Sequence, residues 1–106
     1  MITELGLHVL LAVGRGALHG YAIGKDIEER TEGRVDPTTG ALYQALKRLT
    51  DDGLVQPVRA PAGRGSDPRR KYFALTAAGK RAVATEIKRL ESIIATARDR
   101  SLYGTS

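Results

Sequence analysis

Residues 40–55, GALYQALKRLTDDGLV, place polar side chains at the spacing of one helix face. At about 100° per residue, one arc carries Gly40, Tyr43, Gln44, Lys47 and Asp51. The opposite arc carries small and aliphatic residues, namely Ala41, Leu42, Ala45, Leu46 and Leu49. Hydroxyl, amide and ammonium groups can bind phosphate oxygens or base edges, and a helix fits the major groove of DNA. The alternative is an ordinary amphipathic surface helix, and this segment alone does not decide between the two.

The ends of this helix carry their own signals. Asp36 suits the N-cap and Pro37 suits the first helical position. Gly53 suits the position just beyond the C-terminus, and Leu54 can then contact Leu49. We therefore predict a helix that begins at Pro37 and ends before Gly53.

A basic hairpin supplies the second set of residues that could do chemistry. Its cations are Arg59, Arg64, Arg69, Arg70 and Lys71. Asp67 alone opposes them, and residues 61–106 carry a net charge of +6 whereas residues 1–60 carry −1. Such a local positive field attracts a polyanion. Arg64 lies between two glycines and could reach a phosphate or a minor groove. The alternative is a solvated edge whose charges prevent aggregation.

Two strand-forming segments joined by a polar tip predict this hairpin. Residues 54–60 favour a β-strand, but Pro57 restricts them to the edge of a sheet. Residues 69–76 form a better strand. The polar segment 61–68, rich in glycine and proline, predicts the tip between the two strands.

Two helices that precede residue 37 must position the polar face of residues 40–55 and the basic hairpin. Thr3 can cap a helix that runs to about Val13 and is apolar round most of its circumference, so it must be buried on several sides. A second helix is expected from residue 19 or 20 to residue 32, with Gly33 as its stop.

The last helix is expected from residue 77 to 101, with Thr76 as its N-cap. Its apolar positions follow spacings of 4, 3, 4 and 3 and are Val83, Ile87, Leu90, Ile94 and Ala97. This narrow stripe is typical of a helix–helix seam, although about two heptads are too few to hold two chains alone. We predict a homodimer interface completed by Leu5 and Val9; the alternative is packing on the chain's own domain. The tail, residues 103–106, is expected to fray.

The order helix, helix, helix, strand, tip, strand, helix is that of a winged helix-turn-helix, an α+β fold that is mostly α. The second helix then braces the DNA backbone, the third enters the major groove, and the hairpin contacts phosphates. We expect a DNA-binding domain over residues 1–76 and a dimerisation helix with its tail over residues 77–106. A dimer would bind a palindromic operator on double-stranded DNA, with half-sites about one turn apart.

Three motifs connect the chain to a known family. They are HGYAI at 19–23, GALYQALKRLTDDGLV at 40–55 and RRKYFALTAAGKR at 69–81. The chain resembles the PadR family of transcriptional regulators, in the short form with one helix after the wing. The resemblance implies a bacterial, dimeric winged-helix repressor, often released from DNA by a small-molecule effector. It also implies that the C-terminal helix makes the dimer.

One residue departs from the family pattern. The family usually has proline after the tyrosine of the third helix, where this chain has Gln44. Glutamine can donate to and accept from adenine at once, so Gln44 could read a base edge. The alternative, equally weighted, is that Gln44 only continues the helix.

Roles for the other residues follow from their placement. Thr38 and Thr39 lie in the first turn, where hydroxyls and free N–H groups meet phosphate. Tyr43 could bind phosphate or pack beneath the wing, and Lys47 could contact DNA or pair with Asp51. Tyr21 could reach the DNA backbone or lie in the core. The expected DNA-binding residues are Tyr21, Thr38, Thr39, Gly40, Tyr43, Gln44, Lys47, Arg64, Arg69, Arg70 and Lys71.

Other functions find little support. The chain has no cysteine, which excludes disulfides, thiolate zinc sites and a cysteine nucleophile. His8 and His19 are too few and too badly spaced for a metal site, and no catalytic set stands out. We expect no enzyme activity, no cofactor, no metal and no membrane segment. The apolar start carries Glu4 and lacks a basic leader, so we expect a cytoplasmic protein.

Two questions stay open at this point. A winged-helix module that binds proteins without specific DNA binding is the alternative function, and the arginine-rich wing argues against it. The sequence does not identify an effector. Its four tyrosines and one phenylalanine, with no tryptophan, offer little surface for stacking a flat molecule. A ligand pocket is expected at the dimer seam, walled by the first and last helices.

Overall fold

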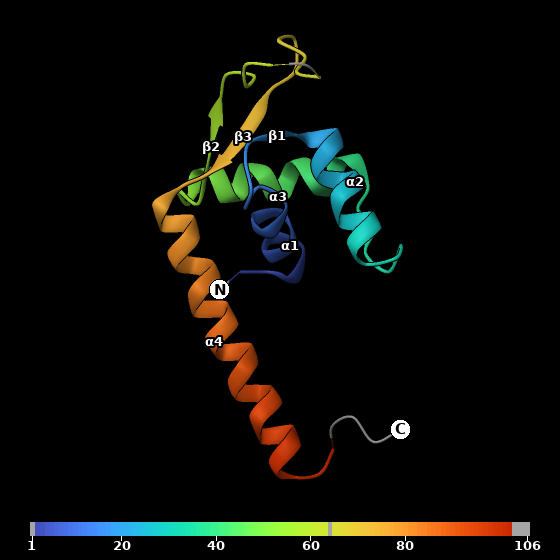
Figure 1. Ribbon diagram of the computed structural model, residues 1–106, viewed down its shortest axis with the longest axis vertical. Helices are drawn as coiled ribbons and strands as arrows, with labels where there is room; N and C mark the ends of the chain where they lie inside the picture. Colours follow the sequence, from blue (N-terminus) through green and yellow to red (C-terminus); the bar gives the residue numbers. More distant parts are fainter. Residues whose placement is uncertain (1, 64, 103–106) are drawn as a thin grey trace.

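The computed structural model describes residues 2–63 and 65–102. In chain order its elements are α1 (Glu4–Ala12), β1 (Leu18–His19), α2 (Gly20–Arg30), α3 (Thr39–Asp51), β2 (Val55–Val58), β3 (Tyr72–Leu75) and α4 (Ala77–Asp99). The first three helices lie together below a small sheet, and α4 runs away from them (Figure 1). The predicted winged helix-turn-helix fold, mostly helical, is confirmed. The expectations for Arg64 and for residues 103–106 lie outside the described residues.

The core lies where α1, α2 and α3 meet the sheet. Its largest fully buried side chains are Val9, Leu10, Val13, Ile23, Ile27, Leu46 and Val55. Each such side chain stabilises the fold by about 1.5–3 kcal/mol when it leaves water. The predicted dimer role of Val9 is wrong, because its side chain is 0% exposed within one chain. Leu5 is only half-buried and stays available to a partner.

Threonine hydroxyls cap three of the helices. Thr3 accepts the Gly6 N–H at 2.9 Å, and Thr76 accepts the Gly79 N–H at 2.9 Å, as predicted. The predicted start of α3 at Asp36 and Pro37 is wrong. Thr38 is the N-cap instead, with an extended backbone and a hydroxyl that accepts the Ala41 N–H at 3.1 Å. Asp36 and Pro37 therefore belong to the preceding connection.

The end of α3 follows the prediction. Gly53 has a φ of +75°, in the left-handed region, and the Leu54 N–H donates to the Leu49 carbonyl at 2.9 Å. This bond closes a Schellman motif. By contrast α2 ends at Arg30, two residues earlier than predicted, and Gly33 takes a positive φ of 78° beyond it.

The sheet has the order β1-β3-β2, with both pairings antiparallel. β2 lies at an edge, as Pro57 requires. β1 was not predicted: Leu18 pairs with Phe73, and His19 pairs with Tyr72. The central strand β3 therefore joins a strand that leads directly into α2 to a strand that follows α3. We call residues 55–75 the wing; its strands are thus fixed to both helices.

α4 begins on the domain and then leaves it. A side chain at Gly79 would collide with the Leu54 carbonyl oxygen, so glycine allows the helix to start close to the end of α3. Gly79 and Glu86 are its buried residues. Beyond Glu86 the helix extends along the 51 Å long axis of the molecule (Figure 1) and ends at Asp99, two residues before the predicted end.

Candidate nucleic-acid interface

Three elements converge on one side of the domain. A hollow of about 250 Å³ lies where the start of α2, the middle of α3 and the wing meet. Its lining residues are His19, Gly20, Tyr21, Tyr43, Arg70 and Lys71. Four of these were predicted from the sequence to bind DNA, and the structure brings them to one place although they span 50 positions of the chain. We call Tyr21, Tyr43, Arg70 and Lys71 the anchor group.

The two tyrosines of the anchor group have different surroundings. Tyr21 is 65% exposed, so the alternative of a core tyrosine is wrong. Tyr43 is 46% exposed and its hydroxyl lies against the backbone of Gly20, where any side chain would collide with it. Gly20 therefore allows α2 and α3 to approach closely at this point. The sequence alone did not indicate that Gly20 is needed for this close approach.

A second hollow of about 330 Å³ continues the surface between α2 and α3. Tyr21, Tyr43 and Thr39 line it, and so does Lys25, an exposed cation that the sequence analysis did not select. Thr38, Thr39 and Gly40 are all exposed at the start of α3. The first turn of α3 thus presents backbone N–H groups and hydroxyls beside the anchor group.

Lys47 takes the local partner that the sequence allowed. Its Nζ lies 3.0 Å from an Asp51 carboxylate oxygen, and the two side chains are 78% and 62% exposed. An exposed ion pair of this kind contributes about 0–1 kcal/mol. Lys47 can therefore exchange Asp51 for a phosphate at little cost.

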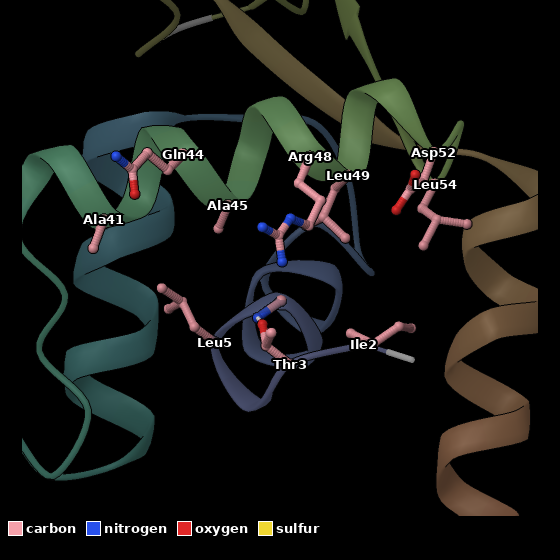
Figure 2. A pocket seen from close by; sticks show the side chains of 11 residues that line it. Ile2, Thr3, Leu5, Ala41, Gln44, Ala45, Arg48, Leu49, Asp52 and Leu54 are labelled. Atoms are coloured by element: carbon pink, nitrogen blue, oxygen red, sulfur yellow. Dashed lines mark hydrogen bonds between the residues drawn. The ribbon is translucent and has the colours of Figure 1, made fainter.

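Gln44 lies at the border of a different hollow (Figure 2). This hollow of about 450 Å³ separates α3 from the start of α1, and Gln44, Arg48 and Asp52 supply its polar groups. The structure therefore does not join Gln44 to the anchor group. Ala41, on the arc of small and aliphatic residues, borders the same hollow and is exposed.

The cations of the wing have different surroundings. Arg69 is 88% exposed, and its Nε lies 3.1 Å from an Asp67 carboxylate oxygen. Lys71 is exposed and lies 5.7 Å above the Phe73 ring. Arg70 faces the start of α2, 5.7 Å from the centre of the Tyr21 ring. Arg70 and Lys71 thus belong with the helices, whereas Arg69 extends into solvent.

Two titratable groups of this region have shifted pKa values. Hydrogen bonds from the Arg69 side chain and backbone lower the pKa of Asp67 below its usual value. Partial burial and the nearby Arg70 charge lower the pKa of His19. His19 was missed as a site residue because histidine is not among the common N-cap residues. Its side chain nevertheless caps α2, accepting the Ala22 N–H at 3.1 Å.

Other kinds of site find no support in the described residues. No group of three or more metal-binding side chains occurs within residues 2–63 and 65–102. In the same part of the chain, no helix has the length and apolar character needed to cross a membrane.

Comparisons with known proteins place these features in context. Residues 9–85 match the model of the transcriptional regulator PadR-like family. A protein of Streptomyces fradiae, described as an uncharacterized 37.1 kDa protein in transposon TN4556, is 40% identical over 78 residues. Those residues are 74% of this chain and 20% of that protein, so the chain spans about a fifth of this relative's length.

Solved structures share the fold. A PadR family transcription regulator from Clostridium difficile superposes with a TM-score of 0.75 at 21% identity, covering 92% of this chain and 97% of that one. Bacillus subtilis PadR in complex with operator DNA gives a TM-score of 0.66 at 24% identity, covering 80% of this chain and 48% of that one. At these identities the likeness establishes the architecture.

Proposed function

Because the chain belongs to the PadR-like family of transcriptional regulators, we propose that it binds operator DNA in the cytoplasm as a homodimer and represses transcription there. The observation that carries the proposal is the anchor group. Two tyrosine hydroxyls and two cations from α2, α3 and the wing surround one hollow of about 250 Å³. A backbone phosphate supplies the acceptors that these donors need. Members of the family are regulators rather than enzymes, so no catalytic residue is assigned.

The proposed docking follows from the anchor group. With a phosphate held there, the exposed arc of α3 faces the major groove and presents Lys47 to the DNA. Thr38, Thr39 and Gly40 add hydroxyl and N–H donors at the start of the helix. Arg64 and Arg69 complete the predicted wing contacts. Gln44 lies at the edge of this arc, and its reading of a base stays a prediction.

The dimer forms the second part of the proposal. We assign residues 1–76 to DNA binding and residues 77–106 to dimerisation. The exposed side chains that support this are Ile87 at 41%, Ile93 at 52% and Ile94 at 40%, all on one arc of α4. With Leu90 and Ala97 they form an apolar surface of the kind that a second copy covers. Val83 and Leu5 also pack on the chain's own core, and their part in the interface stays a prediction. A symmetric dimer binds two half-sites about 34 Å apart on a palindromic operator.

A small-molecule effector forms the third part. The pocket expected at the dimer seam, walled by α1 and α4, stays a prediction. Within one chain, a hollow of about 450 Å³ lies between α1 and α3 (Figure 2). Ile2 and Leu5 line it from the α1 side and Leu49 from α3, while Arg48 and Asp52 bring one cation and one carboxylate. We place the effector here and infer a largely apolar molecule, because most of the lining is apolar and the Arg48 and Asp52 charges oppose each other. Its binding would act directly on α3. A titration with the apolar anion 8-anilinonaphthalene-1-sulfonate tests the site; absence of enhanced fluorescence contradicts it.

A salt-dependent titration tests DNA binding. The labelled promoter of the protein's own operon and a random duplex are each titrated, with anisotropy detection, at several salt concentrations. We expect tighter binding to the promoter, and a slope of log affinity on log salt that falls by about 1 in Lys71→Ala. The matched control is Lys88→Ala on the outer face of α4, which removes the same charge outside the proposed interface. No binding to either duplex at low salt would instead favour a protein-binding module.

Footprinting of the same promoter tests the dimer geometry. Two protected half-sites related by a two-fold axis support the homodimer. A single protected half-site would contradict it.

A further inference from the structure

His19 occupies a junction between the wing and α2. It ends β1, where it pairs with Tyr72 of β3, and its side chain caps α2. Its Nδ1 accepts the Ala22 N–H at 3.1 Å and lies 3.2 Å from an Arg70 guanidinium nitrogen. One ring nitrogen thus joins the start of a helix to a cation of the wing.

The surroundings hold this ring in place. Tyr72 packs edge-on against it, with ring centres 5.3 Å apart, and Tyr21 lies nearly parallel to it at 6.4 Å. The Tyr72 hydroxyl accepts the Asp67 N–H at 2.9 Å, and an Asp67 carboxylate oxygen lies 3.7 Å from the Arg70 Nε.

The hydrogen bonds fix the protonation state of the ring. A backbone amide and a guanidinium can only donate, so Nδ1 must accept and the ring proton must sit on Nε2. A second proton would attach to Nδ1, the atom that already serves as acceptor. That proton would break the cap of α2 and set a positive imidazolium against the Arg70 guanidinium.

We infer that His19 is a positioning residue for DNA binding: its neutral imidazole holds Arg70, and through it the wing, against the start of α2. Protonation of the ring releases Arg70 from that position. The inference rests on the proposed function, because Arg70 belongs to the anchor group. Extra positive charge normally tightens DNA binding, so a loss of affinity as the ring gains charge is a distinctive result.

The charges around the ring define the pH range. The groups that face it are Arg70, Asp67, Lys71 and the hydroxyls of Tyr21, Tyr43 and Tyr72. The pKa of Asp67 is lowered by Arg69, so this carboxylate stays ionised at pH 5. The His19 pKa lies below its ordinary value of 6.5, so its contribution is complete at neutral pH and is lost as pH falls.

Two substitutions separate positioning from simple capping. His19→Asn keeps an acceptor at the position of Nδ1 and a favourable N-cap but cannot titrate. His19→Ala removes the acceptor altogether. At pH 8 we expect His19→Asn to bind promoter DNA within about 2-fold of wild type, and His19→Ala about 10-fold more weakly. Between pH 8 and pH 5, at fixed salt, wild type should lose affinity relative to His19→Asn, which differs from it only at residue 19.

A double-mutant cycle measures the coupling to Arg70. If His19 acts through Arg70, adding His19→Ala to Arg70→Ala costs less than about 2-fold, because the group it positions is already gone. Fully additive losses would overturn the inference and leave His19 as a helix cap alone. Identical pH profiles for wild type and His19→Asn would also overturn it.

The free protein gives a readout that does not depend on DNA. Imidazole ¹H–¹⁵N spectra should show the His19 proton on Nε2, and the Arg70 side-chain resonances should titrate with the His19 ring in wild type but not in His19→Asn. A proton on Nδ1 at pH 8 overturns the inference whatever the DNA result. If the resonances titrate together but neither duplex is bound, the proposed function fails while the contact between His19 and Arg70 stands.

Discussion

The side of the domain that carries the anchor group and the long helix α4 differ in how many of their polar and apolar groups find partners within one chain. Around the anchor group, helix caps, ring contacts and ion pairs are made within the chain, and no buried side-chain polar atom of the described residues lacks a partner. On α4, nothing beyond Glu86 in the described part is buried, and Ile87, Ile93 and Ile94 face solvent. The first region is therefore preorganised, whereas the second leaves large apolar side chains exposed in the described part of the chain.

The largest expected effect comes from charging the apolar arc of α4. In Ile87→Glu combined with Ile94→Glu, two carboxylates per chain enter the proposed seam, and we expect dimerisation to weaken by at least about 100-fold because unpaired buried charges are costly. Sedimentation velocity measures this dissociation, and operator affinity should fall with it. The matched control is Thr85→Glu with Ser92→Glu, which puts the same charges on exposed positions of the opposite arc. Equal dimerisation in both double variants would remove the contrast between the two regions.

A smaller effect should follow from disturbing the preorganised side. Gly20→Ala puts a methyl group against the Tyr43 hydroxyl, so α2 and α3 must separate or Tyr43 must turn away. We expect a loss of about 1–3 kcal/mol in the free energy of unfolding and roughly 10-fold weaker binding to DNA. Urea unfolding and anisotropy measure the two quantities. The control is Gly24→Ala on the same helix, where a side chain would make only an ordinary contact with Leu42 at 3.6 Å. Wild-type behaviour of Gly20→Ala would show that the close approach is not needed.

The smallest effect is expected at Lys47. Lys47→Ala removes one proposed phosphate contact and an exposed ion pair, so binding should weaken about 3-fold and the salt slope should fall by about 1. The stability in urea should stay within about 0.5 kcal/mol of wild type. Asp51→Ala, which frees Lys47 without removing it, is the matched control and should bind slightly more tightly. Wild-type affinity together with an unchanged salt slope in Lys47→Ala would exclude a DNA contact at this position.

The sequence predicted those parts of the fold that depend on near neighbours. The caps Thr3 and Thr76, the Gly53 terminus and the edge position of the Pro57 strand are set within a few residues, and each is found. The start of α3 was misplaced because Asp36 and Thr38 compete as caps two residues apart. Local signals cannot rank two such candidates.

Long-range contacts explain what the sequence did not predict. β1 has two residues and no alternation, and it exists only because β3 pairs with it. His19 gains its contacts from Tyr72 and Arg70, more than 50 positions away. The assignment of Val9 failed because a helix that is apolar all round does not reveal which side its own domain covers.

The pairing of Leu18 with Phe73 also bears on the order in which contacts form during folding. It closes a loop of more than half the 106-residue chain, and long closures carry an entropic cost that delays them in folding. The helices around Leu10, Ile27 and Leu46 can associate before that closure. We therefore expect the pairing of β1 with β3 to form late as the chain folds and to be lost early when it opens.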